Sequence, residues 1–105
     1  MKELVIIDDD YLVVQALETI VNSKENLTVV ATGHSGQDAI DLYQQHQPDL
    51  LLMDIRMEPM SGLSTFEHFK TLDSPWPVLF LTGHGDVRMA VDAVKNGAWD
   101  FLEKP

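Results

Sequence analysis

The stretch "DLLLMD", residues 49–54, is an apolar run that ends on an acidic residue. A half-exposed strand would alternate apolar and polar side chains, but this stretch has four apolar residues in a row. Such a run is typical of a strand in a parallel sheet that is covered on both faces. We therefore expect a buried central strand that brings Asp54 to the carboxyl edge of the sheet.

Four more short apolar runs predict strands on either side of this one. They are "LVII" (4–7), "LTVVAT" (27–32), "PVLFLT" (77–82) and "WDFL" (99–102). Helical periodicity fills the intervals. The first helix carries one apolar stripe: Val13, Ala16, Leu17, Ile20 and Val21.

The other three helices also have start signals or stripes. Ser35 and Asp38 form a predicted capping box before Ala39, Ile40 and Tyr43, and Pro48 ends that helix. The third stripe is Leu63, Phe66, Phe69 and Leu72. In the fourth helix Asp86 is the expected N-cap, Asn96-Gly97 the C-cap, and the stripe is Val87, Ala90, Val91 and Val94.

The order βαβαβαβαβ predicts one α/β domain over residues 1–105, with a parallel sheet, right-handed crossovers and helices on both faces. No linker, repeat or low-complexity tract interrupts it.

The net charge of −10 argues against nucleic-acid binding, since binding to phosphate backbones needs a basic face. The chain has no cysteine, which excludes disulfides and thiolate metal sites. We see no apolar run long enough for a membrane span and no signal-peptide pattern at the N-terminus.

Polar residues gather where the predicted strands end. Asp8 and Asp9 follow the first strand, Asp54 ends the third, Thr82 ends the fourth, and Lys104 follows the fifth. Ligands of open parallel sheets bind beyond these carboxyl ends. The sequence therefore predicts a site of three acids, one hydroxyl and one amine.

Three carboxylates in one place repel one another unless a cation joins them. Few protein oxygens are offered, which favours Mg²⁺ with water in its remaining positions over Ca²⁺. A metal, an amine and a hydroxyl also suit a transferring phosphoryl group, whose oxygens need neutralising while a carboxylate attacks. Asp54, central in the sheet, is the predicted nucleophile.

Four segments resemble the receiver domain of bacterial two-component response regulators. They are "IIDDD" (6–10), "LLLMDIRM" (50–57) with "SG" (61–62), "LFLTGHGD" (79–86) and "GAWDFLEKP" (97–105). The resemblance covers nearly the whole chain and implies a doubly wound, flavodoxin-like sheet with strand order 2-1-3-4-5. The stretch "TGHGDVRMAVDAVKNGAWDFLEKP" (82–105) looks most like transcriptional regulators of the nitrogen-fixation and nitrogen-regulation type.

The resemblance implies a role for each matching residue. Asp8 and Asp9 would hold Mg²⁺ together with Asp54 and the backbone carbonyl of Arg56. Asp54 would take the phosphoryl group from a sensor histidine kinase, and Lys104 would form the ion pair.

The resemblance also implies a conformational switch. Thr82 would bond a phosphoryl oxygen, and Phe101 would change rotamer as the loop after the fourth strand moves in. The chain would then be a cytoplasmic signalling module that catalyses its own phosphoryl transfer and hydrolysis rather than a metabolic enzyme. It would bind neither nucleic acid nor membrane itself, and the face of the fourth helix and fifth strand is a candidate homodimer surface.

The chain departs from the family pattern at two places. Glu58 stands where proline is common, which adds a carboxylate near the predicted metal. The chain also ends at Pro105, before the family's fifth helix and any output domain. Without that helix we expect an exposed apolar patch beside the first helix, near the first and fifth strands, covered by another copy or by residues beyond Pro105.

Two other classes compete with this interpretation. A Mg²⁺-dependent phosphatase of the haloacid-dehalogenase type would use aspartates two apart, as Asp8 and Asp10 are, but no cap region is present. A flavin-binding module of the same topology would need a phosphate-cradling Ser/Thr/Gly loop after the first strand, where this chain has acids. Asp10 alone is better explained as a helix cap. The histidines share no ligand spacing and are interpreted as surface or loop residues: His34, His46, His68 and His84.

Overall fold

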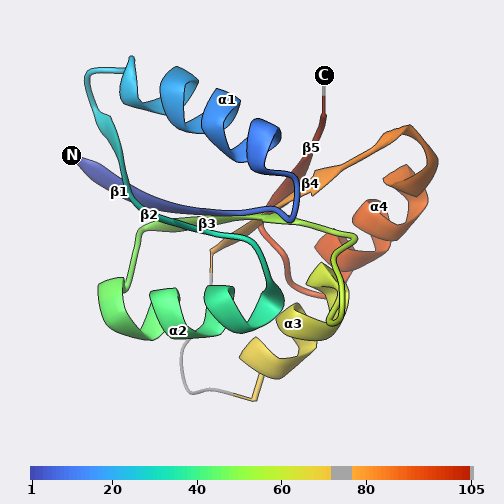
Figure 1. Cartoon of the computed structure of the whole chain (residues 1–105). Helices are drawn as coiled ribbons and strands as arrows, with labels where there is room; N and C mark the ends of the chain where they lie inside the picture. Colours follow the sequence, from blue (N-terminus) through green and yellow to red (C-terminus); the bar gives the residue numbers. More distant parts are fainter. Residues whose placement is uncertain (72–76, 105) are drawn as a thin grey trace.

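Five parallel strands form one sheet in the order β2-β1-β3-β4-β5, as predicted (Figure 1). The computed structural model describes residues 1–71 and 77–104. The strands are β1 (Lys2–Ile7), β2 (Leu27–Gly33), β3 (Leu50–Asp54), β4 (Val78–Thr82) and β5 (Asp100–Glu103). In β3, residues 51–54 are all buried, which fits a strand covered on both faces.

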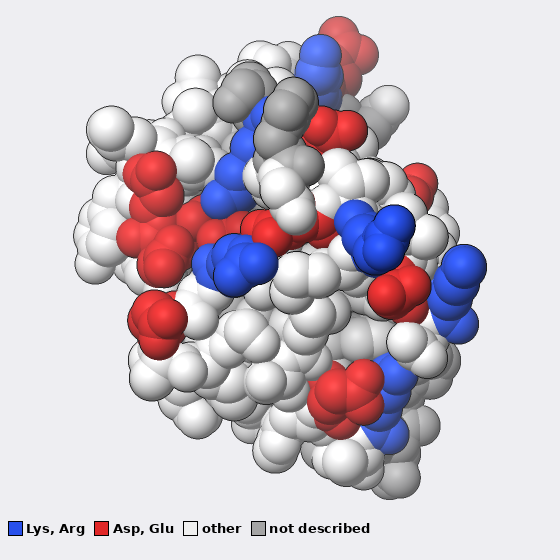
Figure 2. All heavy atoms as spheres, turned by 90° about the vertical axis from the view of Figure 1, so that its right-hand side faces the viewer, with Lys and Arg blue, Asp and Glu red and all other residues white. Residues whose placement is uncertain are grey.

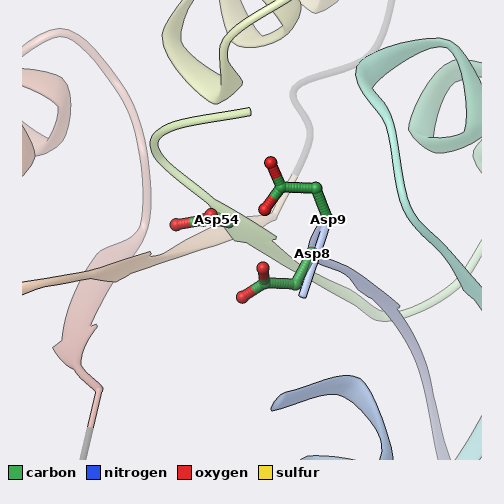
Figure 3. A group of neighbouring side chains, drawn as sticks. All are labelled: Asp8, Asp9 and Asp54. Atoms are coloured by element: carbon green, nitrogen blue, oxygen red, sulfur yellow. The ribbon is translucent and has the colours of Figure 1, made fainter. Parts of the chain in front are cut away.

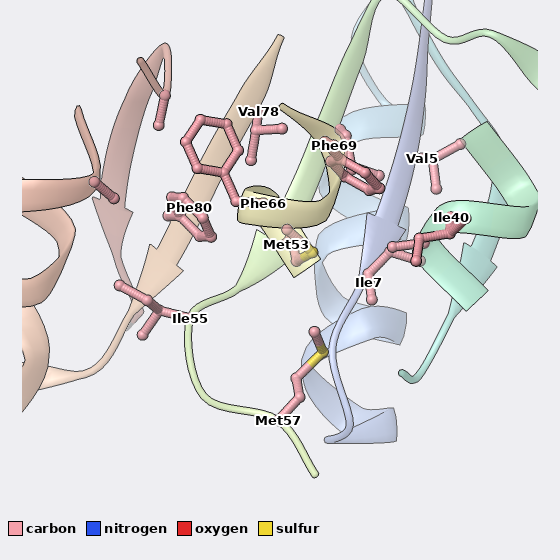
Figure 4. Packing of buried hydrophobic residues seen from close by; sticks show 14 of the residues in the cluster. Val5, Ile7, Ile40, Met53, Ile55, Met57, Phe66, Phe69, Val78 and Phe80 are labelled. Carbon is pink, nitrogen blue, oxygen red and sulfur yellow. The ribbon is translucent and has the colours of Figure 1, made fainter. Parts of the chain in front are cut away.

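The helices divide unequally between the two faces of the sheet (Figure 1). They are α1 (Tyr11–Asn22), α2 (Gly36–His46), α3 (Gly62–Phe69) and α4 (Val87–Lys95), with a short 3₁₀ turn at His84–Asp86. One apolar cluster joins the sheet to α2, α3 and α4 through side chains such as Ile40, Phe66 and Phe69 (Figure 4). A second, smaller cluster joins the opposite face to α1 through Val14 and Val21.

The buried side of α1 is rotated from the predicted stripe. Val14 and Val21 are buried and Leu17 packs against them, whereas Ala16 is exposed and Ile20 is 55% exposed. The prediction was wrong for Ala16 and Ile20. The apolar residues of this helix cover a wider arc than the part of the sheet that α1 contacts, so only one edge of the arc is buried.

The starts of α2 and α3 fix the loops around the sheet edge. Ser35 Oγ accepts from the Asp38 N–H, as the capping box predicts, but the Asp38 carboxylate accepts from the N–H of His34 rather than Ser35. At Gly62 a Cβ would collide with the backbone carbonyl of Asp54. A residue without a side chain is needed there so that α3 can begin against the end of β3.

The start of α4 differs from the prediction. Asp86 occupies the N-cap position, but its side chain makes no cap bond, because its carboxylate binds Arg56 instead. Gly97 has the expected left-handed backbone after the helix, with φ 118°. Leu72, placed on the third stripe, lies outside the described residues.

The face that α1 covers also leaves apolar side chains exposed near β5, as expected. Leu102 is 53% exposed and alternates with Phe101, which packs against the larger cluster on the opposite face. Trp99 is exposed and lines a groove of about 350 Å³ with Leu4 and Leu50 of the smaller cluster. Within the described residues, no helix has both the length and the apolar character needed to span a membrane.

Candidate functional site

Three carboxylates converge at the carboxyl edge of the sheet. Asp8 and Asp9 follow β1, and Asp54 is the last residue of β3 (Figure 3). One oxygen of each lies within 4.8 Å of the others. The space-filling view of this side of the molecule has a band of acidic atoms bordered by basic ones (Figure 2). The convergence predicted from strand order is therefore present.

Lys104 joins the two buried acids from the fifth strand. Its Nζ lies 2.8 Å from Asp8 Oδ2 and 3.2 Å from Asp54 Oδ1. The backbone fixes this placement, because the Lys104 N–H donates to the Thr82 carbonyl at 2.8 Å. Asp8 and Asp54 are both buried, so the ammonium group partly offsets the cost of holding two carboxylates away from water.

Asp54 and Asp9 nevertheless have raised pKa values. Burial, with the charge of Asp8 next, raises the pKa of Asp54 to about 6, although Lys104 and the N–H of Arg56 act against this. Burial and Asp8 likewise raise the pKa of Asp9. Burial alone would lower the pKa of Lys104, but its contacts with Asp8 and Asp54 outweigh that and raise it. The site carries more negative charge than Lys104 balances.

The donor set suits a hard divalent cation. Asp8 Oδ2 is buried and accepts no hydrogen bond of good geometry from the described residues, although Lys104 Nζ lies 2.8 Å away. A cleft of about 280 Å³ adjoins the acids, lined by Asp9, Arg56, Met57, Glu58 and Ser61. Three carboxylates that share one lysine and an open cleft fit a cation that takes oxygen ligands and keeps part of its water. Glu58, the departure from the family pattern, borders the same cleft, and the bond between Glu58 and Pro59 is cis.

Asp10 does a different job from its two neighbours. Its Oδ1 accepts from the N–H of Leu12 at 3.0 Å and of Val13 at 3.5 Å. It is the N-cap of α1, and the cap interpretation is confirmed.

The side of the site formed by β4 and α4 is held by fewer bonds. Thr82 is fully buried, and its Oγ1 donates to the Gly83 carbonyl at 3.1 Å. Arg56 Nε lies 2.7 Å from both carboxylate oxygens of Asp86, which ties the loop after Asp54 to the start of α4. Phe101 is partly buried against the core. The catalytic and switch roles of Thr82 and Phe101 stay predictions.

Sequence reasoning missed two residues that contact this edge. His34 Nδ1 lies 3.0 Å from the backbone carbonyl of Asp8, and its ring stacks on Tyr11 with 3.6 Å between the centroids and 5° between the planes. A signal was available, since His34 follows the strand that neighbours β1 at the same edge. The stacking partner was not predictable, because ring orientation depends on packing.

A parallel sheet with three carboxylates and a lysine at its carboxyl edge defines an α/β domain whose site suits a cation and a phosphoryl group. The response regulator receiver domain family matches residues 4–105, and the chain belongs to this family.

Relatives and solved structures agree. The chain is 31% identical to the chemotaxis protein CheY of Bacillus subtilis over 105 residues, covering all of the chain and 88% of that protein. It is 39% identical to the response regulator protein TodT of Pseudomonas putida over 100 residues, covering 95% of the chain but only 43% of TodT. A receiver domain structure from Clostridium thermocellum superposes with a TM-score of 0.89 at 26% identity, covering 100% of this chain and 83% of that one.

The chain is thus a receiver domain of the two-component systems, in which phosphorylation on aspartate is the standard function. The haloacid-dehalogenase alternative is not supported, since the family match spans nearly the whole chain.

Proposed function

We propose that Asp54 is the phosphoacceptor of this receiver domain and that Lys104 and Thr82 assist the transfer. One observation carries the proposal: Asp54 is the buried acid at the end of the central strand, and Lys104 Nζ lies 3.2 Å from its Oδ1. Its pKa of about 6 leaves it mostly ionised at neutral pH, as a nucleophile must be.

Phosphoryl transfer to Asp54 and the later hydrolysis need no reactant other than the phosphoryl donor and water. An Asp54 oxygen attacks the phosphorus of a phosphohistidine, a new P–O bond forms, the P–N bond breaks, and the leaving imidazole nitrogen takes a proton from water. In hydrolysis, water attacks the phosphorus, the P–O bond to Asp54 breaks, and inorganic phosphate leaves with the proton. The Lys104 ammonium faces the oxygens on which charge collects.

We infer that Asp8, Asp9 and Asp54, with the carbonyl of Arg56, would hold Mg²⁺. The ion would neutralise charge on the phosphoryl oxygens during transfer. Support comes from the convergence of the three carboxylates and from the cleft beside Asp9.

We further propose that phosphorylation changes the position of α4. Thr82, at the end of β4, would turn its hydroxyl from the Gly83 carbonyl to a phosphoryl oxygen, and Phe101 would fill the space that this movement frees. The face of α4 and β5 would then present an altered surface, on which a homodimer could form. The charge added at Asp54 biases a pre-existing equilibrium.

The wider setting is also a proposal. The phosphoryl donor would be a sensor histidine kinase, the location cytoplasmic, and the output transcriptional, with residues 1–105 as the receiver unit. We propose that a further helix packs over Leu102 and Trp99, because both of these large apolar side chains are exposed.

Acetyl phosphate with Mg²⁺ tests the phosphoacceptor. Intact-mass spectrometry should give one phosphoryl adduct for the wild type and for Asp41→Ala, an exposed acid on α2, but none for Asp54→Ala. An undiminished adduct in Asp54→Ala would show that another residue accepts the phosphoryl group.

A further inference from the structure

We propose that His34 is a positioning residue for the acidic pair Asp8–Asp9, acting through the peptide that joins them. The inference rests on the proposed function, because it concerns how well this pair holds Mg²⁺. Asp8 is hydrogen-bonded to several parts of the chain.

Each polar group of Asp8 faces a fixed neighbour. Its N–H donates to the Gly33 carbonyl at 3.1 Å, its Oδ1 accepts from the Asp10 N–H at 2.9 Å, and its Oδ2 faces Lys104. The backbone carbonyl is reached by His34 Nδ1 at 3.0 Å. A carbonyl only accepts, so Nδ1 must carry the proton.

The bond to this carbonyl bears directly on Asp9. The Asp8 carbonyl and the Asp9 N–H belong to one planar peptide, so holding the oxygen fixes the plane from which the Asp9 side chain departs. Asp9 is exposed and borders the open cleft, whereas Asp8 is buried and faces Lys104. Its direction therefore depends on the backbone more than that of buried Asp8 does.

His34 is itself held from two sides. Its backbone N–H donates to Asp38 Oδ2 at 2.9 Å, which anchors the His34 backbone to the start of α2. Its ring stacks on Tyr11, the first residue of α1, with only 5° between the planes. The backbone of His34 is thus tied to the start of α2 and its ring stacks on the start of α1, and Nδ1 lies 3.0 Å from the Asp8 carbonyl. A ligand supported in this way loses less freedom when it binds a metal.

Two substitutions separate the hydrogen bond from the ring. His34→Asn keeps a side-chain N–H donor near the place of Nδ1 but loses the ring, whereas His34→Phe keeps a ring to stack on Tyr11 but loses the donor. His68→Phe, on an exposed position of α3, is the matched control.

The readout is Mg²⁺ affinity, measured as the Mg²⁺ dependence of each variant's unfolding midpoint relative to its own metal-free midpoint. We expect His34→Phe to weaken Mg²⁺ binding about tenfold, the usual effect of losing a group that orients a metal ligand. His34→Asn should stay within about threefold of the wild type, since its donor is retained. In acetyl phosphate labelling, the half-saturating Mg²⁺ concentration should rise in His34→Phe while the rate at saturating Mg²⁺ changes little.

The Mg²⁺ titrations test the positioning role of His34 and the metal site separately. If His34→Phe binds Mg²⁺ as the wild type does, or His34→Asn is as impaired as His34→Phe, the positioning role is wrong. If the wild type itself shows no response to Mg²⁺, the proposed metal site fails instead, so the two failures are distinguishable.

Discussion

The two halves of the site differ in how firmly they are held. In the β1–β3 half, Asp8 and Asp54 are buried and share Lys104, and Asp8 also contacts β2 and the loop after it. In the β4–α4 half, the hydroxyl of Thr82 makes one bond, to the neighbouring Gly83 carbonyl, and α4 is tied to the site by Arg56, whose side chain is 68% exposed. The proposed phosphoacceptor thus lies in the half with more side-chain hydrogen bonds and ion pairs. The proposed conformational change lies in the half with fewer of them, so fewer must break for it to occur.

The largest expected effect is on stability, in the firm half. Between pH 3.8, where a free aspartate titrates, and about 6, where Asp54 titrates, the folded state binds more protons than the unfolded state. Its stability therefore falls as pH rises through this window and stays lower above it. In chelator at pH 7, Asp54→Asn should be more stable than the wild type by on the order of 1–3 kcal/mol.

Urea denaturation at pH 4 and pH 7 measures this effect. The advantage of Asp54→Asn should shrink toward pH 4, where wild-type Asp54 is already neutral. Asp41→Asn, on an exposed face of α2, should change little at either pH. A mutant less stable than the wild type at pH 7 would mean that Lys104 already balances the charge.

The second prediction separates Asp9 from Asp10, two adjacent acids in different roles. Mg²⁺ at a hundred times its dissociation constant should stabilise the wild type by about 2.7 kcal/mol, because it binds only the folded state. Asp9→Asn should lower the Mg²⁺ affinity by more than about tenfold, at least as much as losing an orienting group. Asp10→Asn should lower it only slightly, since Asp10 caps α1. If thermal titrations show the same loss of Mg²⁺ affinity in both mutants, the assignment of Asp9 as a ligand and Asp10 as a cap is wrong.

The third prediction concerns the looser half. Thr82→Ala removes a buried hydroxyl with one bond, so it should cost about 1 kcal/mol and leave Asp54 able to accept a phosphoryl group. Phosphorylation should then no longer shift the amide signals of Val87–Lys95, which it shifts in the wild type. Normal shifts in the mutant would remove Thr82 from the coupling.

The smallest effect is expected at the link between the halves. Arg56→Gln breaks an ion pair that is largely exposed on the arginine side and should cost less than about 1 kcal/mol. It also frees Asp86 to cap α4, so hydrogen exchange at the first turn of that helix should change while exchange in β1 and β3 does not. Unchanged exchange in α4 would show that the ion pair does not hold the helix.

The firm half was the more predictable one. Strand order brings Asp8, Asp54 and Lys104 to one edge whatever the side chains do, and an unalternated run reveals the central strand. Contacts for which a side chain has more than one possible partner were not predictable from the sequence. Asp86 has the sequence of an N-cap, but a guanidinium thirty residues away in the chain takes its carboxylate. Ile20 fits a helical stripe, yet the sheet covers only one edge of that stripe.

The most direct test of the central claim traps the acyl phosphate chemically. Borohydride reduces a phosphorylated aspartate to homoserine and leaves free carboxylates intact, so peptide mapping after acetyl phosphate treatment identifies the acceptor. We predict homoserine at position 54, dependent on Mg²⁺ and absent without the phosphoryl donor. Homoserine at position 8 or 9, or at none of the three acids, would contradict the assignment of Asp54 as the phosphoacceptor.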